Sequence, residues 1–122
     1  MKAKRYNALG ALMVIIATHN YAIGQTTISS IWNGSVDNNW ATFNNWTHTP
    51  LPTPLDFPNN DANYNYNVDI STASVLLNAT ATINNLDVGS GGILTIGNSR
   101  SLTMSQTGTV NNGTIMLDSS GS

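Results

Sequence analysis

The sequence contains no cysteine and no glutamate. The absence of cysteine excludes a disulfide framework, thiolate zinc sites and a cysteine nucleophile, so a small exported core would need another source of stability. Charged residues make up only 8% of the 122 residues, while asparagine, serine, threonine and glycine are abundant from Gln25 onward. The expected surface is therefore polar but carries few ionic groups.

Basic residues are scarce, and three of the four lie within the first five positions, up to Arg5. An apolar run without charge follows at residues 8–17. A basic start followed by such a run is typical of a secretory signal peptide, and about ten apolar residues fall short of the roughly twenty that span a bilayer. We therefore predict an exported chain, at the cell surface or extracellular, with no stable transmembrane anchor in these residues.

The end of the signal peptide is indicated by small residues on either side of Ile23. Ala22 and Gly24 stand at the −3 and −1 positions of a cut before Gln25, which suits a signal peptidase. We predict a signal peptide over residues 1–24, with cleavage between Gly24 and Gln25. Cleavage after Ala22 is the alternative.

Removal of this segment changes the charge balance of the chain. Arg100 would be the only remaining Lys or Arg against six Asp, and one positive minus six negative charges gives −5. Nucleic-acid binding requires clustered basic residues that neutralise phosphates, and anionic membrane surfaces attract the same groups. Nucleic acid is therefore excluded as a partner, and anionic membrane surfaces are disfavoured.

The segment at residues 25–63 is rich in aromatic residues and turn formers. Trp32, Trp40 and Trp46 lie among Asn-Gly and Asn-Asn pairs, and all four prolines fall within residues 50–58. Proline lacks a backbone donor and is excluded from helix interiors and central strands. We expect an aromatic cap here, followed by an extended, Pro-rich surface connection from His48 to Asn60.

Short alternating strands are predicted over residues 64–122. Residues 64–70 alternate apolar and polar side chains, and apolar-polar-apolar triplets start at Leu86, Leu94 and Leu102, eight residues apart. A longer repeat of 27 residues relates Thr82-Ile83-Asn84-Asn85 to Thr109-Val110-Asn111-Asn112. Turn-forming residues separate the triplets.

This spacing predicts an all-β fold, a right-handed parallel β-helix (solenoid) with an aromatic N-terminal cap. Inward apolar side chains would form columns, and asparagines or serines at equivalent turns would form hydrogen-bonded rows along the outside. A β-sandwich is the alternative, because its strands also alternate with turns every eight to twelve residues. About two repeats are present, so we expect residues 64–122 to be the incomplete start of this domain in a fragment of a longer protein.

Four short motifs precede the triplets: Ile31-Trp32-Asn33-Gly34, Asn38-Asn39-Trp40, Asn44-Asn45-Trp46 and Tyr66-Asn67-Val68-Asp69-Ile70. Together with the triplets, they resemble secreted bacterial β-solenoid proteins with autotransporter-like β-strand repeats. Many of those proteins carry a PEP-CTERM sorting signal or an autotransporter barrel. The resemblance covers residues 31–122 and implies an extended solenoid with an aromatic cap. The Pro-rich connection is longer here than is usual in this pattern.

Catalytic chemistry is not supported by the sequence. A lyase needs clustered carboxylates with a basic residue, and Arg100 is the only such base; a glycoside hydrolase needs two carboxylates on one face. Asp69 and Asp87 are outward strand positions but 18 residues apart, so we expect them on different sides of the molecule. His48 is expected in an exposed loop without a second imidazole. We predict no enzyme, no metal and no cofactor.

Two groups of residues have side chains that could bind a ligand. Oxygen donors at Asp56, Asn59, Asn60, Asp61 and Asn63 could suit Ca²⁺, but their spacing matches no EF-hand and a solvated turn is the expectation. The three tryptophans could form a platform that stacks on extracellular glycans, although we favour the cap. Four Asn-x-Ser/Thr sequons at Asn33, Asn45, Asn78 and Asn112 are expected to mark exposed turns.

The sequence therefore predicts a noncatalytic surface or secreted protein with an adhesin, stalk or extracellular matrix role. Its partners would be extracellular glycans or surface components, and an open final edge would allow end-to-end self-association. The alternative is the N-terminal part of a carbohydrate-active or glycan-binding β-helix protein.

Overall fold

The computed structural model describes residues 24–118, which form ten strands and one short 3₁₀ helix. The predicted signal peptide, apart from Gly24, lies outside the described residues. The elements are β1 (Thr26–Trp32), η1 (Phe43–Asn45), β2 (Trp46–Thr49), β3 (Tyr64–Ile70), β4 (Ser74–Leu77), β5 (Ala81–Ile83), β6 (Asn85–Val88), β7 (Ile93–Ile96), β8 (Leu102–Met104), β9 (Val110–Asn111) and β10 (Thr114–Leu117).

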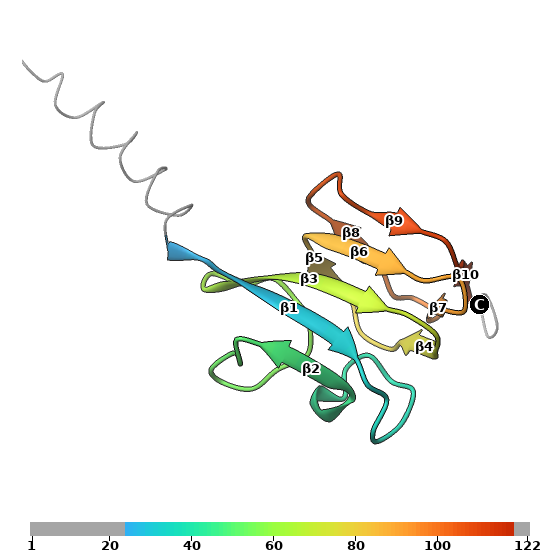
Figure 1. The fold of residues 1–122 in the computed structure, drawn as a ribbon, viewed down its shortest axis with the longest axis horizontal. Helices are drawn as coiled ribbons and strands as arrows, with labels where there is room; N and C mark the ends of the chain where they lie inside the picture. The colour runs from blue at the N-terminus through green and yellow to red at the C-terminus, as the bar shows by residue number, and fades with distance from the viewer. Residues whose placement is uncertain (1–23, 119–122) are drawn as a thin grey trace, which may run out of the picture.

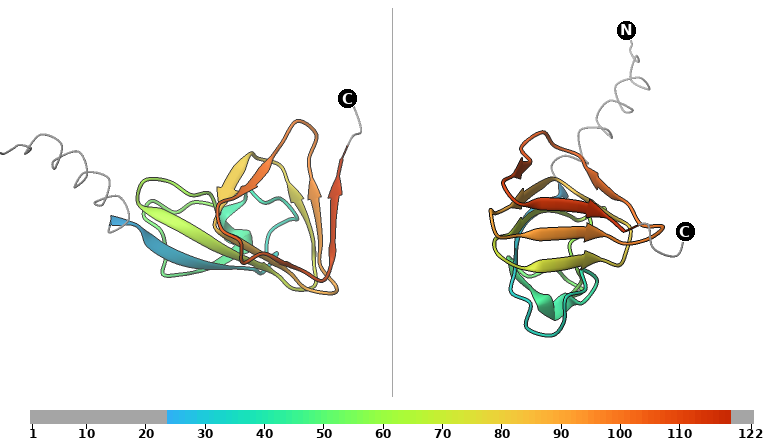
Figure 2. Two further views of the ribbon diagram at one scale, coloured as in Figure 1. Left: turned by 90° about the horizontal axis from the view of Figure 1, so that it is seen from above. Right: turned by 90° about the vertical axis from the view of Figure 1, so that its right-hand side faces the viewer.

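The strands belong to three sheets. The first has the order β2-β1-β3-β6-β9, and Figure 1 shows these strands side by side. The second has the order β10-β7-β4, and the third contains β5 and β8. All strand pairs are parallel except β1 and β2, which run antiparallel. Successive strands of the chain therefore move from one sheet to the next, and Figure 2 shows the resulting stack.

The prediction of a right-handed parallel β-helix is wrong, and so is the β-sandwich alternative. The chain is mostly β, but its sheets are mixed and parallel in a small, compact structure. The mixed sheet arises because β2 pairs with β1 in antiparallel orientation, with Trp46 and His48 pointing into the core. The aromatic residues and prolines of residues 25–63 predict a cap and a surface connection, whereas the structure places β1 and β2 in this segment.

The predicted 27-residue repeat is also wrong. Ile83 lies in β5 of the third sheet, whereas Val110 lies in β9 of the first sheet, opposite Asp87. Neighbouring strands are related by smaller shifts, such as 18 residues between Asn67 and Asn85. The short Thr-Ile/Val-Asn-Asn similarity therefore does not correspond to stacked positions.

The core lies between the three sheets and is built from the apolar columns that the alternation predicted. Val68 is opposite Leu86 in the first sheet, and Val75 is opposite Leu94 in the second. All four are at most 3% exposed. Parallel register places similar side chains one strand spacing apart, about 4.8 Å, so each column excludes water continuously across its sheet.

Asparagine side chains form hydrogen bonds between neighbouring strands, but mostly from positions within β3 and β6 and not at the predicted turns. Asn84 Nδ2 donates to Asn65 Oδ1 at 2.9 Å, and Asn85 Nδ2 donates to Asn67 Oδ1 at 3.1 Å. Asn60 Nδ2 adds a further donor to Asn84 Oδ1 at 3.1 Å. These bonds tie neighbouring strands together through side chains as well as through the backbone.

The two ends of the sheets differ in how their edges are covered. At one end β2 covers β1, and Asn38 and Trp40 each make a 2.8 Å backbone hydrogen bond with Leu76 of β4. At the same end, the backbone oxygen of Thr82 in β5 accepts from the backbone N–H of Asn60, and the backbone N–H of Thr82 donates to the side chain of Asn59. At the other end β8, β9 and β10 are each the last strand of their sheet among residues 24–118.

Gly89, in the turn between β6 and β7, lies against the turn after β3. A Cβ at this position would lie 2.5 Å from the backbone oxygen of Ser71, so we expect Gly89→Ala to lower the free energy of unfolding by about 1–3 kcal/mol through overpacking. Gly91→Ala is the matched control, because its Cβ would meet Thr72 at 3.4 Å or more. Urea unfolding followed by circular dichroism should show a lower midpoint for Gly89→Ala only.

Candidate functional site

The three tryptophans form one cluster but differ in exposure. Trp40 is 0% exposed and Trp46 is 3% exposed. Trp46 makes edge-to-face contacts with Trp32 at 4.9 Å and with Trp40 at 4.8 Å between ring centroids. Their burial removes Trp40 and Trp46 from any sugar-stacking platform, and Trp32, which is only partly buried, is left as the candidate.

Hydrogen bonding divides the three indoles in the same way. Trp40 Nε1 donates to the oxygen of Pro58 at 3.0 Å, and Trp46 Nε1 donates to the oxygen of Trp40 at 2.8 Å. Trp32 Nε1 has no acceptor among residues 24–118. Trp32 therefore has both a partly exposed ring and a donor that remains to be satisfied by solvent or a ligand.

Asn45 organises the loop that follows Trp32. Its Nδ2 donates to Asp37 Oδ1 at 2.6 Å and to the oxygen of Asn39 at 3.0 Å, while its Oδ1 accepts from the backbone N–H groups of Val36 and Asp37. The side chain is fully buried, so the expectation of an exposed turn at this sequon is wrong. All four hydrogen-bonding positions of the amide are used, which fixes the loop beside Trp32.

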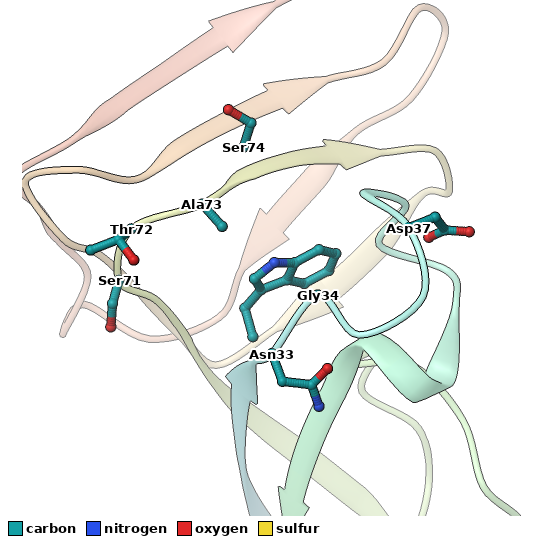
Figure 3. A pocket seen from close by; sticks show the side chains of 8 residues that line it. Asn33, Gly34, Asp37, Ser71, Thr72, Ala73 and Ser74 are labelled. Carbon is teal, nitrogen blue, oxygen red and sulfur yellow. The ribbon is translucent and has the colours of Figure 1, made fainter.

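The loop and the turn between β3 and β4 enclose a hollow with a volume of about 330 Å³ (Figure 3). Its walls come from the end of β1, from the loop that Asn45 fixes, and from the start of β4. The lining residues are Trp32, Asn33, Gly34, Asp37, Ser71, Thr72, Ala73 and Ser74. Aromatic surface and several polar groups therefore converge on a space of small-molecule size.

Asp37 is held in its ionised form at this hollow. The backbone N–H of Asn39, 2.9 Å from Oδ1, is the main cause that holds the pKa of this carboxyl below its usual value, and the side chains of Asn45 and Thr42 act in the same direction. Hydrogen bonds to a carboxylate favour its charged form. The hollow therefore carries a negative charge near neutral pH.

His48 is buried, which corrects the expectation of an exposed loop histidine. It lies on β2 and is 6% exposed, with Nδ1 2.7 Å from Ser30 Oγ. Its ring stacks on Phe43, and its Nε2 has no hydrogen-bond partner among the described residues. Because Ser30 is itself 0% exposed, this Ser–His pair has no access to a substrate and serves packing.

The stability of the protein is expected to fall as the pH decreases below 6.5. Burial lowers the pKa of His48 from 6.5, so the unfolded chain binds a proton at a pH where the folded chain does not. Stability therefore rises with pH across the window between the folded pKa and 6.5. Unfolding midpoints measured from pH 5 to 7 should show this slope, and His48→Phe should flatten it; equal slopes would contradict the assignment.

Asp69 and Asp87 lie side by side, which corrects the prediction that they occupy different sides. They are register partners on β3 and β6, and both line a second hollow of about 250 Å³ on the outer face of the first sheet. Ser71 Oγ donates to Asp69 Oδ1 at 3.0 Å. Two carboxylates about one strand spacing apart repel each other, so this pair costs stability.

Replacing Asp87 with asparagine is expected to raise the free energy of unfolding by roughly 0.2–1 kcal/mol, because it removes a like-charge pair. The gain should shrink in 1 M NaCl, where exposed charges are screened. Asp61→Ala is the contrasting variant, because Asp61 Oδ1 accepts from the backbone N–H groups of Asn63 and Tyr64. A higher free energy of unfolding for Asp61→Ala, or an unchanged one for Asp87→Asn, would contradict this interpretation.

The oxygen-rich segment considered for Ca²⁺ uses its side chains for local structure. Asn59 Oδ1 accepts from the backbone N–H of Thr82, and Asn60 Oδ1 accepts from that of Tyr66, each at 2.9 Å. Asp56 Oδ1 accepts from the N–H of Phe57 at 2.8 Å. Within residues 24–118 there is no group of three or more His, Cys, Asp or Glu arranged to hold a metal ion.

Comparison of the chain with protein-family models, curated proteins and solved structures finds no match. None of the helices within residues 24–118 combines the length and apolar character needed to cross a membrane. Trp32 was predicted together with Trp40 and Trp46 as a cap or glycan platform, whereas Asp37, Asn45 and Ser30 were not predicted to have a role. The run Asp37-Asn38-Asn39 is a sequence signal for an Asx turn, in which the aspartate side chain accepts from the backbone N–H two residues later.

Proposed function

We propose that this chain is an exported, noncatalytic protein of the cell surface or the extracellular space, with a structural or adhesive role. The basic start, the apolar run and the small residues before Gln25 support export. The first strand begins at Thr26, so cleavage before Gln25 would leave every described strand intact. A stalk or matrix role requires association with further chains rather than a reaction.

The observation that carries this role is the exposed end of the three sheets. The final strands β8, β9 and β10 have one unpaired edge each among the described residues, whereas β4 and β5 at the opposite end are bonded to the segments around Asn39 and Asn60. Large apolar side chains are exposed there, including Met104 at 40%, Val110 at 46% and Leu117 at 80%. Open strand edges that carry apolar side chains are templates for pairing with another chain.

A second copy of this chain is the partner that we propose for the exposed end. Within residues 24–118, this end is the one that offers an open edge on all three sheets, because β4 and β5 at the other end are bonded to the segments around Asn39 and Asn60. A second copy that matches all three edges must therefore use the same end. Such a contact joins the same surface on both copies and closes into a symmetric dimer.

Export is tested by expressing the full chain with a C-terminal tag in a bacterium and sequencing the N-terminus of the secreted or surface fraction. The expected mature N-terminus is Gln25. Ile15→Arg, which places a charge in the apolar run, is the matched control and should keep the chain in the cytoplasm. Recovery of the wild-type chain in the cytoplasm with Met1 intact would contradict export.

Self-association is tested by sedimentation velocity on the processed chain over a range of concentrations. We expect a concentration-dependent dimer that Leu117→Lys shifts toward monomer, because lysine on an open edge opposes strand pairing. Leu51→Lys is the matched control, since Leu51 is 62% exposed but follows β2 and belongs to none of β8, β9 and β10. A wild-type chain that stays monomeric at every concentration would argue against this contact.

A further inference from the structure

We propose that the hollow beside Trp32 binds one sugar ring of a neutral oligosaccharide or polysaccharide. This inference rests on the proposed export only because such glycans are encountered outside the cytoplasm. Its geometry is independent of the strand edges, since the hollow is lined by the end of β1, the loop after it and the turn before β4. Binding at Trp32 and association through β10 can therefore succeed or fail separately.

The first argument is the aromatic platform. The indole of Trp32 is steadied by an edge-to-face contact with Trp46, at an interplanar angle of 84°, while its own ring lines the hollow. A sugar ring presents a face of C–H groups that packs on a flat aromatic surface, and its hydroxyls can accept from an indole N–H. Trp32 is the one tryptophan of the cluster that offers both.

The position of the indole is fixed from the loop side by Gly34. Its φ is +59°, a left-handed conformation that glycine adopts without strain, and a Cβ there would lie 2.9 Å from Trp32 Nε1. The backbone after Trp32 can therefore pass close to the indole edge only because residue 34 has no side chain. A fixed aromatic ring binds a ligand with little loss of side-chain entropy.

Polar groups surround the platform on the sides that a sugar's hydroxyls would meet. Asp37, whose carboxylate accepts from Asn39, Thr42 and Asn45 within the loop, adds a negative charge on the loop side of the hollow. Thr72 and Ser74 contribute exposed hydroxyls from the opposite side, and neither side chain makes a hydrogen bond to another residue within 24–118. A few convergent polar groups around an aromatic surface fix the orientation of a polar ligand.

Charge and size narrow the class of sugar. No Lys or Arg lines the hollow, Asp37 is ionised there, and the chain from Gln25 onward carries six Asp against one Arg. Uronic acids and sulfated sugars would therefore be repelled. The volume of about 330 Å³ lies at the small end of the roughly 300–1,000 Å³ range of small-molecule sites, which suits a single ring with neighbouring rings in solvent.

The test uses the purified chain with cellohexaose, chitohexaose and xylohexaose as neutral probes and hexagalacturonate as the acidic probe. Binding is followed by calorimetry and by tryptophan fluorescence, to which Trp32 contributes the solvent-accessible signal. At least one neutral probe is expected to bind saturably, and Trp32→Ala should weaken it on the order of tenfold or more, as for an aromatic anchor at the centre of a contact. Hexagalacturonate should bind more weakly than that probe.

Two further variants keep the test decisive if Trp32→Ala disturbs the cluster with Trp46. Trp32→Phe retains a ring against Trp46 and should bind with intermediate affinity. The double variant Thr72→Ala/Ser74→Ala changes only exposed hydroxyls and should weaken binding with an unchanged unfolding midpoint, whereas Leu51→Ala should behave as the wild type. The proposal is overturned if no neutral probe binds, if Trp32→Ala binds as tightly as the wild type, or if hexagalacturonate binds best.

Discussion

Replacing Trp40 with alanine is expected to lower the free energy of unfolding by about 3–5 kcal/mol, the usual cost of truncating a fully buried tryptophan. The ring is 0% exposed, packs edge-to-face on Trp46, and donates from Nε1 to the oxygen of Pro58. Its removal leaves a cavity between the first sheet and the Pro-rich segment. Domains of this size have only about 5–15 kcal/mol in total, so this loss is a large fraction of the stability of the protein.

The measurement is urea unfolding followed by far-ultraviolet circular dichroism, with two comparison variants. Trp40→Phe keeps most of the apolar volume but leaves the Pro58 oxygen without its donor, so a smaller loss of about 1–3 kcal/mol is expected. Leu51→Ala removes a side chain that is 62% exposed and should change stability by no more than about 0.5 kcal/mol. A Trp40→Ala protein as stable as Leu51→Ala would contradict the buried position of this ring.

Replacing Asn45 with leucine is expected to cost on the order of 3 kcal/mol, although the two side chains are similar in size. The leucine would leave two backbone N–H groups, the oxygen of Asn39 and one Asp37 oxygen short of a hydrogen bond at a buried position. Unsatisfied buried groups cost about 1–3 kcal/mol each when they cannot reach water, and charged ones cost more. The loop beside Trp32 should lose its fixed conformation.

Asn44→Ala is the matched control, because Asn44 is the exposed neighbour whose side chain makes no hydrogen bond within residues 24–118. Asn45→Asp provides a second comparison, because it keeps the acceptor oxygen but places a carboxylate beside Asp37. Its defect should diminish as the pH falls toward 4, when carboxyl groups become protonated. If Asn45→Leu unfolded at the same urea concentration as Asn44→Ala, the bonding described for this amide would be wrong.

The two regions proposed for binding lie at different parts of the fold. The hollow at Trp32 is built where β1 ends and the covering loop begins, whereas the open edges belong to the last strands of each sheet. Variants in one region should therefore leave the other unchanged, since distant sites without shared partners contribute independently. Asn45→Leu, for example, is expected to abolish glycan binding without altering association through Leu117.

Local pattern was sufficient to predict the strands whose residues alternate cleanly. The alternation from Tyr64 to Ile70, and the triplets that begin at Leu86 and Leu94, became β3, β6 and β7, with their apolar positions facing the core. The strands β1 and β2 were missed because their inward positions include Ser30 and His48, which hydrogen-bond to each other in the core instead of presenting apolar side chains. A polar pair that is satisfied by its own partner leaves no hydrophobic period to detect.

The sequence by itself determined the mostly β character of the chain and which side chains of β3, β6 and β7 face the core, because period-two alternation requires only local backbone geometry. The tertiary structure alone decided the antiparallel pairing of β2 with β1, the adjacency of Asp69 and Asp87, and the choice of Trp32 as the accessible tryptophan. Each of these depends on which distant segments pair and in which register. That choice is made by burial and hydrogen-bond satisfaction summed over the whole core, and no local window of residues contains it.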